Sequence, residues 1–132
     1  MRLEPLYSVL FHTPESWQAG DRLFLLAEGR VQGALVGRFR AANYPRRRAD
    51  GTLLPDFRGV IETESGAVVL FAMQGVLRAG EGMRRLVGSV THETEDAGLA
   101  RLNDTVCPVA GEVRERAGGG FEVALEVAEL VV

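Results

Sequence analysis

The sequence PDFRGVIETESGAVVLFAMQGVLR, residues 55–78, carries the strongest structural pattern in the chain. Two runs rich in valine, isoleucine, phenylalanine and threonine flank the turn residues Glu-Ser-Gly at 64–66. This pattern is typical of an antiparallel β-hairpin. The second strand, residues 67–77, is apolar on both faces, so we expect it to be covered on both sides and to lie centrally in a sheet.

Further strands are predicted on both sides of this hairpin, because short apolar or alternating runs recur between turn residues. Gly29 is expected to turn the chain between two of them. The strands predicted outside the hairpin are Arg2–Phe11, Arg22–Glu28, Arg30–Arg40, Met83–Glu95, Thr105–Val109, Gly111–Ala117 and Phe121–Val131.

Two short segments predict single helical turns. Residues 13–15 (Thr-Pro-Glu) offer an N-cap, a proline at the first helical position and an acidic residue in the first turn. Trp17, which follows, is expected to cap one end of the core. The second turn begins at Asp96, where Leu99 and Leu102 lie three residues apart on one side.

The strand count and the glycines together predict a closed barrel. Gly33 and Gly37 share the apolar face of the strand 30–40, which suits a sheet that curls. Closing the sheet removes its exposed edges. We therefore predict an all-β fold, one domain over residues 1–132, built as a single antiparallel β-barrel of about eight strands with one or two short helical turns. Such a barrel has room for packed side chains or one small ligand.

Composition excludes several classes of function. A net charge of −3 gives no bulk attraction to nucleic acid or to an anionic membrane surface, and neither partner is expected. All fifteen basic residues are arginine, so the chain has no lysine nucleophile. Two histidines without metal-ligand spacing predict no metal, and no cofactor motif is present.

Cys107 is the single cysteine, so no internal disulfide can form. We interpret it as a small apolar residue, because no activating pattern surrounds it. With no secretory pattern at the start of the sequence, a cytoplasmic location is expected. No apolar run approaches the roughly 20 residues that a membrane-spanning helix needs.

A string of short patterns spreads over residues 30–116, about two thirds of the chain. They are glycines at 33, 37, 59, 66, 75 and 88, with ANYP at 42–45, RRADG at 47–51, PD at 55–56, IET at 61–63, the strand from 88 to 92, LN at 102–103 and GEV at 111–113. Together they resemble the DUF3237 family, small bacterial and fungal proteins of unknown function.

The resemblance implies an antiparallel β-barrel similar in outline to lipocalin-type and allene-oxide-cyclase-type barrels. It implies no activity, because the family has none established. This chain departs from the family at residues 99–101 (Leu-Ala-Arg), where many relatives carry an aromatic pair. If those aromatics shape a pocket mouth in the relatives, the mouth differs here.

Three polar residues of the central hairpin are candidates for a ligand site. Glu62 lies in an otherwise apolar strand, Gln74 interrupts the facing strand, and Arg58 shares the parity of Glu62. If that face lines the interior, the three converge and the buried carboxylate has a perturbed pKa. If it faces solvent, Arg58 and Glu62 form a modest surface pair. The sequence leaves both arrangements open.

His92 shares the inward-looking parity of its strand with Leu86, Gly88 and Val90. Its pKa near neutrality suits a general base or a group that orients a ligand. The alternative is a half-buried polar residue at a strand end. Among catalytic residues, Glu62 and His92 are the candidates.

Two asparagines, Asn43 and Asn103, are predicted near the barrel mouth. Arginines 46–48 beside Asn43 could clamp an anion, although a short run of like charges is usually only solvated.

Three functions follow as hypotheses. The first is a small-molecule-binding barrel without covalent chemistry, with Arg58, Glu62, Gln74 and His92 inside. The second is a cofactor-free lyase, isomerase or cyclase in which Glu62 or His92 is the acid or base and Arg58 holds an anionic substrate. The third is a structural role in a homodimer or higher homo-oligomer, suggested by valine and leucine on outward parities.

Overall fold

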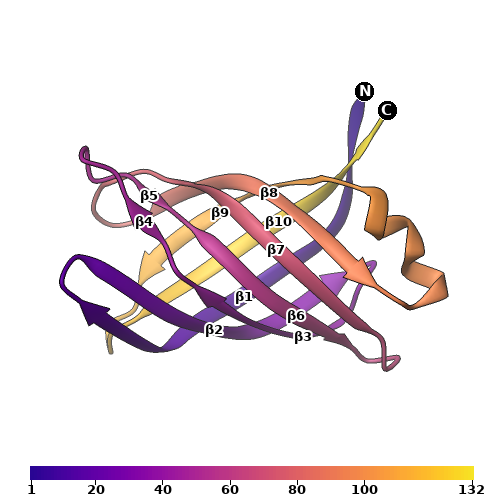
Figure 1. Cartoon of the computed structure of the whole chain (residues 1–132), viewed down its shortest axis with the longest axis horizontal. Helices are drawn as coiled ribbons and strands as arrows, with labels where there is room; N and C mark the ends of the chain where they lie inside the picture. The colour runs from indigo at the N-terminus through magenta and orange to yellow at the C-terminus, as the bar shows by residue number, and fades with distance from the viewer.

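A computed structural model, which describes all 132 residues, shows a closed barrel of eight antiparallel strands (Figure 1). The ring closes because β7 pairs with both β6 and β8. The prediction of an all-β antiparallel barrel of about eight strands is therefore confirmed. The ring consists of β1 (Arg2–Ala19), β2 (Arg22–Gly33), β3 (Gly37–Asn43), β6 (Asp56–Thr63), β7 (Val68–Leu77), β8 (Arg84–Thr94), β9 (Cys107–Glu115) and β10 (Phe121–Val131).

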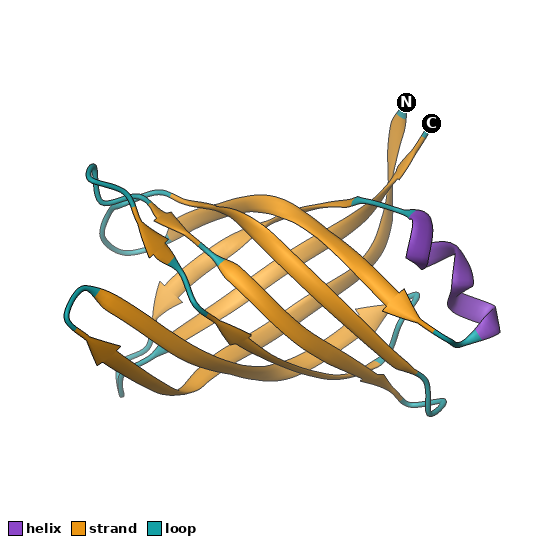
Figure 2. Cartoon of the chain, in the orientation of Figure 1, coloured by secondary structure: helices purple, strands orange, loops and turns teal.

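The two ends of the barrel are built differently (Figure 2). One end carries the 3₁₀ helix η1 (Ala97–Asp104) and both chain termini, and we call it the helix end. The opposite end carries the β1–β2 turn, the β9–β10 turn and the two-residue strands β4 (Arg46–Arg47) and β5 (Leu53–Leu54). We call this the open end.

Aromatic rings fill the middle of the barrel. The ring of Phe39 stacks on Phe11 and on Phe71, with centroid separations of 5.1 and 5.0 Å. These rings belong to one continuous cluster of 24 buried hydrophobic residues. The centre of the barrel is therefore packed, and any space for a ligand must lie toward an end.

Two inward-facing glycines make the stack of rings possible. Gly29 pairs with Phe11 on one side and Phe39 on the other, so no side chain separates the two rings. A Cβ on Gly59 would lie 2.6 Å from the Cζ atom of Phe71. The prediction that Gly29 turns the chain is wrong: it lies inside β2, and the chain turns at residues 34–36. Glycine in a strand here marks a close approach.

The helical turn predicted at residues 13–15 is also wrong. β1 continues through it to Ala19 and pairs with β2, and the register shifts between His12 and Glu15. Pro14 lies in this irregular step, where proline is tolerated because the ladder is already interrupted. Trp17 does not cap the core; it is 53% exposed and packs beside Phe24 on the outer surface.

β7 is covered on one face only, contrary to the prediction. Val69, Phe71 and Met73 are buried in the barrel, whereas Val68 and Leu70 are each about half exposed. A barrel wall has one inside and one outside, and nothing in this chain packs over the outside of β7. The inner face of β7 is apolar because it packs in the core, whereas the apolar side chains of its outer face stay exposed.

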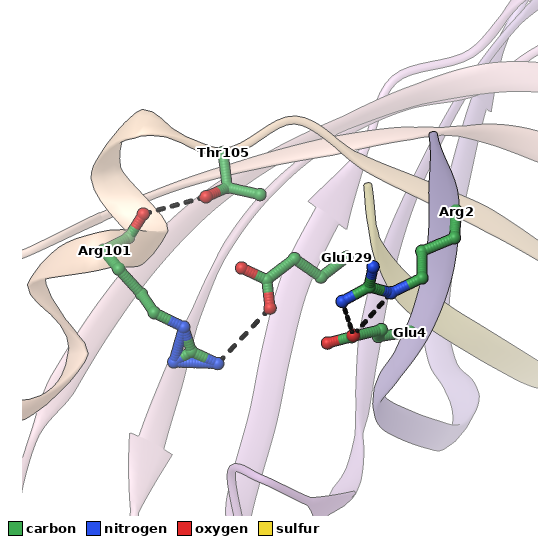
Figure 3. Close-up of polar contacts among 5 residues, drawn as sticks. All are labelled: Arg2, Glu4, Arg101, Thr105 and Glu129. Atoms are coloured by element: carbon green, nitrogen blue, oxygen red, sulfur yellow. Dashed lines mark hydrogen bonds and ion pairs between the residues drawn. The ribbon is translucent and has the colours of Figure 1, made fainter. Parts of the chain in front are cut away.

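η1 confirms the helical turn predicted after Asp96 and closes the helix end. Its Leu102 side chain is 1% exposed and belongs to the barrel core. An ion pair of 3.4 Å joins Arg101 of η1 to Glu129 of β10, and the Thr105 hydroxyl donates to the Arg101 carbonyl oxygen (Figure 3). Crossing a bilayer would need a longer and more apolar helix than any in this structure.

Candidate functional site

The structure places Arg58, Glu62 and Gln74 on the outer surface, so of the two arrangements left open, the one in which they line the interior is wrong. On β6 the opposite parity carries Phe57 and Ile61, and these two larger apolar side chains are buried in the barrel. Antiparallel pairing then sends Gln74 outward as well, because it lies opposite Asp56 on the facing strand.

These outer residues do not converge on one another. Glu62 accepts a hydrogen bond from Arg40 of β3 at 2.6 Å, and Arg58 lies 3.5 Å from Asp56 of its own strand. Each carboxylate and guanidinium is close to half exposed or more. Such surface pairs contribute about 0–1 kcal/mol each. This face therefore offers no buried acid or base.

His92 is buried inside the barrel, as its parity predicts. Its side chain is 2% exposed, and its Nε2 atom lies 2.7 Å from the hydroxyl oxygen of Tyr7 on β1. Tyr7 was not singled out from the sequence, although it shares an alternating inward parity with Val9 and Phe11. The sequence around Tyr7 is otherwise apolar and does not predict that its hydroxyl contacts His92, which lies 85 residues away in the chain.

Burial keeps the Tyr7–His92 pair uncharged. It lowers the pKa of His92 to about 4, so the imidazole is neutral at pH 7. Burial, and secondarily the nearby Cys107, raises the pKa of Tyr7 well above its usual value. The Nδ1 atom of His92 is buried and has no hydrogen-bond partner. Whether His92 acts as a base in any reaction stays a prediction.

Cys107 is fully buried, and burial raises the pKa of its thiol. A protonated, inaccessible thiol is a poor nucleophile. Its surroundings match the interpretation of Cys107 as a small apolar core residue.

A small and mostly apolar pocket lies at the open end of the barrel. Its volume is about 60 Å³, and ten of its fifteen lining residues are hydrophobic. Phe11 and Phe57 meet edge to face at 5.7 Å among these lining residues, and both are buried. Phe11 therefore belongs both to the stack of rings in the middle of the barrel and to the lining of this pocket.

Three polar side chains line the apolar pocket. Asn43 accepts a hydrogen bond from the Asp56 amide at 3.0 Å, and Thr13 accepts one from the Phe121 amide at 2.8 Å. The Arg84 guanidinium lies over the Phe121 ring, 5.9 Å from its centroid. Neither aspartate nor glutamate lines the pocket.

Asn43 therefore lies at the barrel mouth, as predicted. Thr13 and Arg84 were missed. Thr13 was assigned to a helical turn, and Arg84 follows a turn without any motif, so the sequence carries no local signal for either.

Asn103 lies at the helix end of the barrel, whereas the pocket lies at the open end. Its amide nitrogen donates to the Thr94 carbonyl oxygen at 3.0 Å, and its oxygen accepts from the Thr94 amide at 2.8 Å. The side chain thus mimics a neighbouring strand and holds the end of η1 to β8. Asn103 therefore lies at the opposite end of the barrel from Asn43, where it lines a separate open hollow and not the open-end pocket.

The remaining charged candidates do not build a site. Arginines 46–48 are exposed, and Arg48 pairs with Asp50 at 3.4 Å. None of the three lines the pocket, although the nearby Asn43 and Pro45 do. No cluster of three or more histidine, cysteine, aspartate or glutamate side chains is present that could hold a metal ion.

The fold is shared with solved structures of low sequence identity. A protein of unknown function from Clostridium acetobutylicum matches with a TM-score of 0.85 at 14% identity, over 98% of this chain and 99% of that one. A β-barrel-like protein from Acinetobacter baumannii matches with 0.76 at 20% identity, over 96% and 95%. An enzyme from Penicillium herquei matches with 0.62 at 20% identity, over 96% and 93%.

These likenesses show the barrel fold and nothing finer. No family model and no curated protein matches the chain.

Proposed function

We propose that this protein binds a small, largely apolar molecule in the pocket at the open end of the barrel. The observation that supports the proposal is the pocket itself, which combines ten hydrophobic lining residues with three polar side chains. Ligand sites are commonly concave, mostly apolar and supplied with a few polar groups that fix orientation. Mouths of β-barrels are frequent places for them.

The pocket volume limits how much of a ligand can enter. An engineered apolar cavity of about 150 Å³ takes up one benzene molecule. The pocket here measures about 60 Å³, so it accepts a short alkyl group rather than a whole ring system. The rest of the ligand extends through the mouth, past β4 and β5.

A titration by nuclear magnetic resonance tests this function. We expect hexanol to shift the amide signals of pocket residues such as Leu25 and Val123 and to leave those of the helix end unchanged. Substituting Leu23→Trp, at a half-buried lining residue, should weaken binding about tenfold because the larger ring fills the pocket.

The matched control is Leu10→Trp, which places the same ring on the outer surface, where Leu10 is 57% exposed. It should leave hexanol affinity unchanged. Shifts confined to residues outside the pocket, or equal affinity for both variants, would contradict the proposed function.

The alternative, a cofactor-free lyase, isomerase or cyclase, has weaker support. Glu62 is paired with Arg40 at the surface, and His92 does not line the pocket. A fungal protein of this fold is an enzyme, but at 20% identity the likeness extends to the fold alone. The alternative therefore depends on the buried Tyr7–His92 pair, which a substrate can reach only if the helix end opens.

We also propose that two copies of the chain associate through the outer face of β6, β7 and β8. Val68 and Leu70 of β7 are each about half exposed on this face, and Val60 of β6 is paired with Leu70; the pair Val76–Val87 lies farther along β7 and β8. Large exposed apolar patches commonly mark interaction sites.

Charge supports a second copy as the partner. Arg58 on β6 and Glu93 on β8 both line a shallow hollow around Leu70. Suppose that β7 of one copy lies over β7 of the other and that the two-fold axis runs parallel to these strands. Then β6 of each copy lies over β8 of the other copy. Arg58 of one copy then faces Glu93 of the other, so the face is complementary to itself.

Membership of the DUF3237 family and a cytoplasmic location are proposed as well. The first is supported by the motifs spread over residues 30–116. The second is supported by the lone, buried Cys107, which leaves the chain without an internal disulfide.

A further inference from the structure

We infer that the ligand of the open-end pocket is an amphipathic carboxylic acid, with its alkyl part in the pocket and its carboxylate held by Arg84. This inference rests on the proposed function, since it names the chemistry of the molecule bound at that site. Three features of the pocket support it: its charge, its hydrogen-bonding groups and the way Phe121 joins two of them.

Arg84 is the only ionisable side chain that lines the pocket. It is half-buried, and the eight ion pairs of the structure all involve other arginines. A guanidinium that is partly removed from water without a counter-ion is unfavourable until an anion supplies charge-assisted hydrogen bonds. One cation without an acidic neighbour matches a ligand with a single negative charge.

The other polar groups of the pocket offer donors. The Thr13 oxygen accepts from the Phe121 amide, and its hydroxyl hydrogen has no acceptor within the protein. The Asn43 oxygen accepts from the Asp56 amide, which leaves its NH₂ group without an acceptor. An ionised carboxylate only accepts hydrogen bonds, so it complements such a lining. An alcohol, whose hydroxyl is also a donor, complements it less well.

Phe121 joins Thr13 and Arg84 on one side of the pocket. Thr13 holds the Phe121 backbone, and the Arg84 guanidinium lies over the Phe121 ring. The donor groups therefore border an apolar surface made by the ring itself. This is the arrangement that a molecule with a charged head and an alkyl tail requires.

Matched probes test the inference on the full chain. We expect hexanoate at pH 7 to bind about tenfold more tightly than hexanol, as measured by nuclear magnetic resonance titration of the pocket amides. Arg84→Met keeps an unbranched apolar stem and removes the charge. It should lower hexanoate affinity about tenfold and lower hexanol affinity by a clearly smaller factor. Arg85→Met, at the exposed neighbouring position, should change neither affinity.

The outcomes separate the two proposals. Equal affinity of the wild-type protein for hexanoate and hexanol at the pocket, or equal loss of both in Arg84→Met, overturns the assignment of a carboxylate and leaves the binding function standing. Failure of both probes to shift any pocket amide overturns the binding function together with it. An unchanged pattern of backbone amide signals away from the pocket shows that each variant is folded.

Discussion

At the scale of single residues, the buried Tyr7–His92 pair is the most unusual chemistry in the molecule. The pair is joined by one hydrogen bond of 2.7 Å, and the second ring nitrogen of His92 has no partner. Parity alone predicted that His92 points inward. Tyr7 could not be predicted as its partner, because the contact joins β1 to β8 across the barrel.

This pair predicts a dependence of stability on pH. Burial lowers the pKa of folded His92 to about 4, whereas the unfolded chain titrates near 6.5. Between these values the unfolded chain binds a proton that the folded chain excludes, so the free energy of unfolding falls as the pH is lowered. Urea denaturation at pH 7 and pH 4.5 should show a loss about 2 kcal/mol larger in the wild type than in His92→Gln.

The other histidine provides the control. His12→Gln makes the same substitution at a strand irregularity outside the barrel core, and its pH profile is measured for comparison. If His92→Gln and the wild type lose the same stability between these pH values, the imidazole does not titrate as its burial requires.

At the scale of elements, the sequence predicted the strands well where apolar and polar residues alternate. The strand predicted at 83–95 corresponds to β8, and the one at 121–131 to β10. Alternation fails for β7, since valine and leucine occupy both parities. It therefore could not decide which face of β6 and β7 is inside, and Arg58, Glu62 and Gln74 were placed on the wrong side.

Glycine is the second source of error at this scale. A glycine such as Gly29 suits a turn and equally suits a strand that another backbone approaches closely. Only the packing of Phe11 against Phe39 over Gly29 decides between the two, and that packing joins β1 to β3 across β2.

The close approach at Gly29 predicts a strong effect of a single methyl group. In Gly29→Ala the added Cβ would lie 2.0 Å from the Leu10 carbonyl oxygen and 2.7 Å from the Phe11 Cβ atom. The backbone of Leu10 and Phe11 cannot move away without disturbing the pairing of β1 with β2. We therefore expect a loss of about 3 kcal/mol in the free energy of unfolding, measured by urea denaturation. Gly118→Ala, whose Cβ meets nothing within 4 Å, should change stability by less than about 0.5 kcal/mol. Similar stabilities of the two variants would show that β1 and β2 separate easily at this point.

At the scale of the whole molecule, closure of the barrel could be predicted but the pocket could not. Closure follows from counting strands and short turns, which are local. The pocket gathers Thr13, Asn43, Arg84 and Phe121 from four distant parts of the chain. No spacing in the sequence links them, and each is an ordinary residue until the ring of strands brings it to the open end.

The outer surface of the closed barrel leads to the last prediction. We expect the wild-type chain to be a dimer at about 100 μM in light-scattering measurements after size exclusion, and Leu70→Arg to be a monomer because it places two charges at the centre of the shared face. Leu10→Arg, equally exposed on β1, should remain a dimer. In the proposed dimer Arg58 of one copy faces Glu93 of the other, so Arg58→Glu and Glu93→Arg should each weaken the dimer, and the double variant should restore it. If the double variant loses as much dimer stability as the two single variants together, the contact between copies lies elsewhere on the barrel.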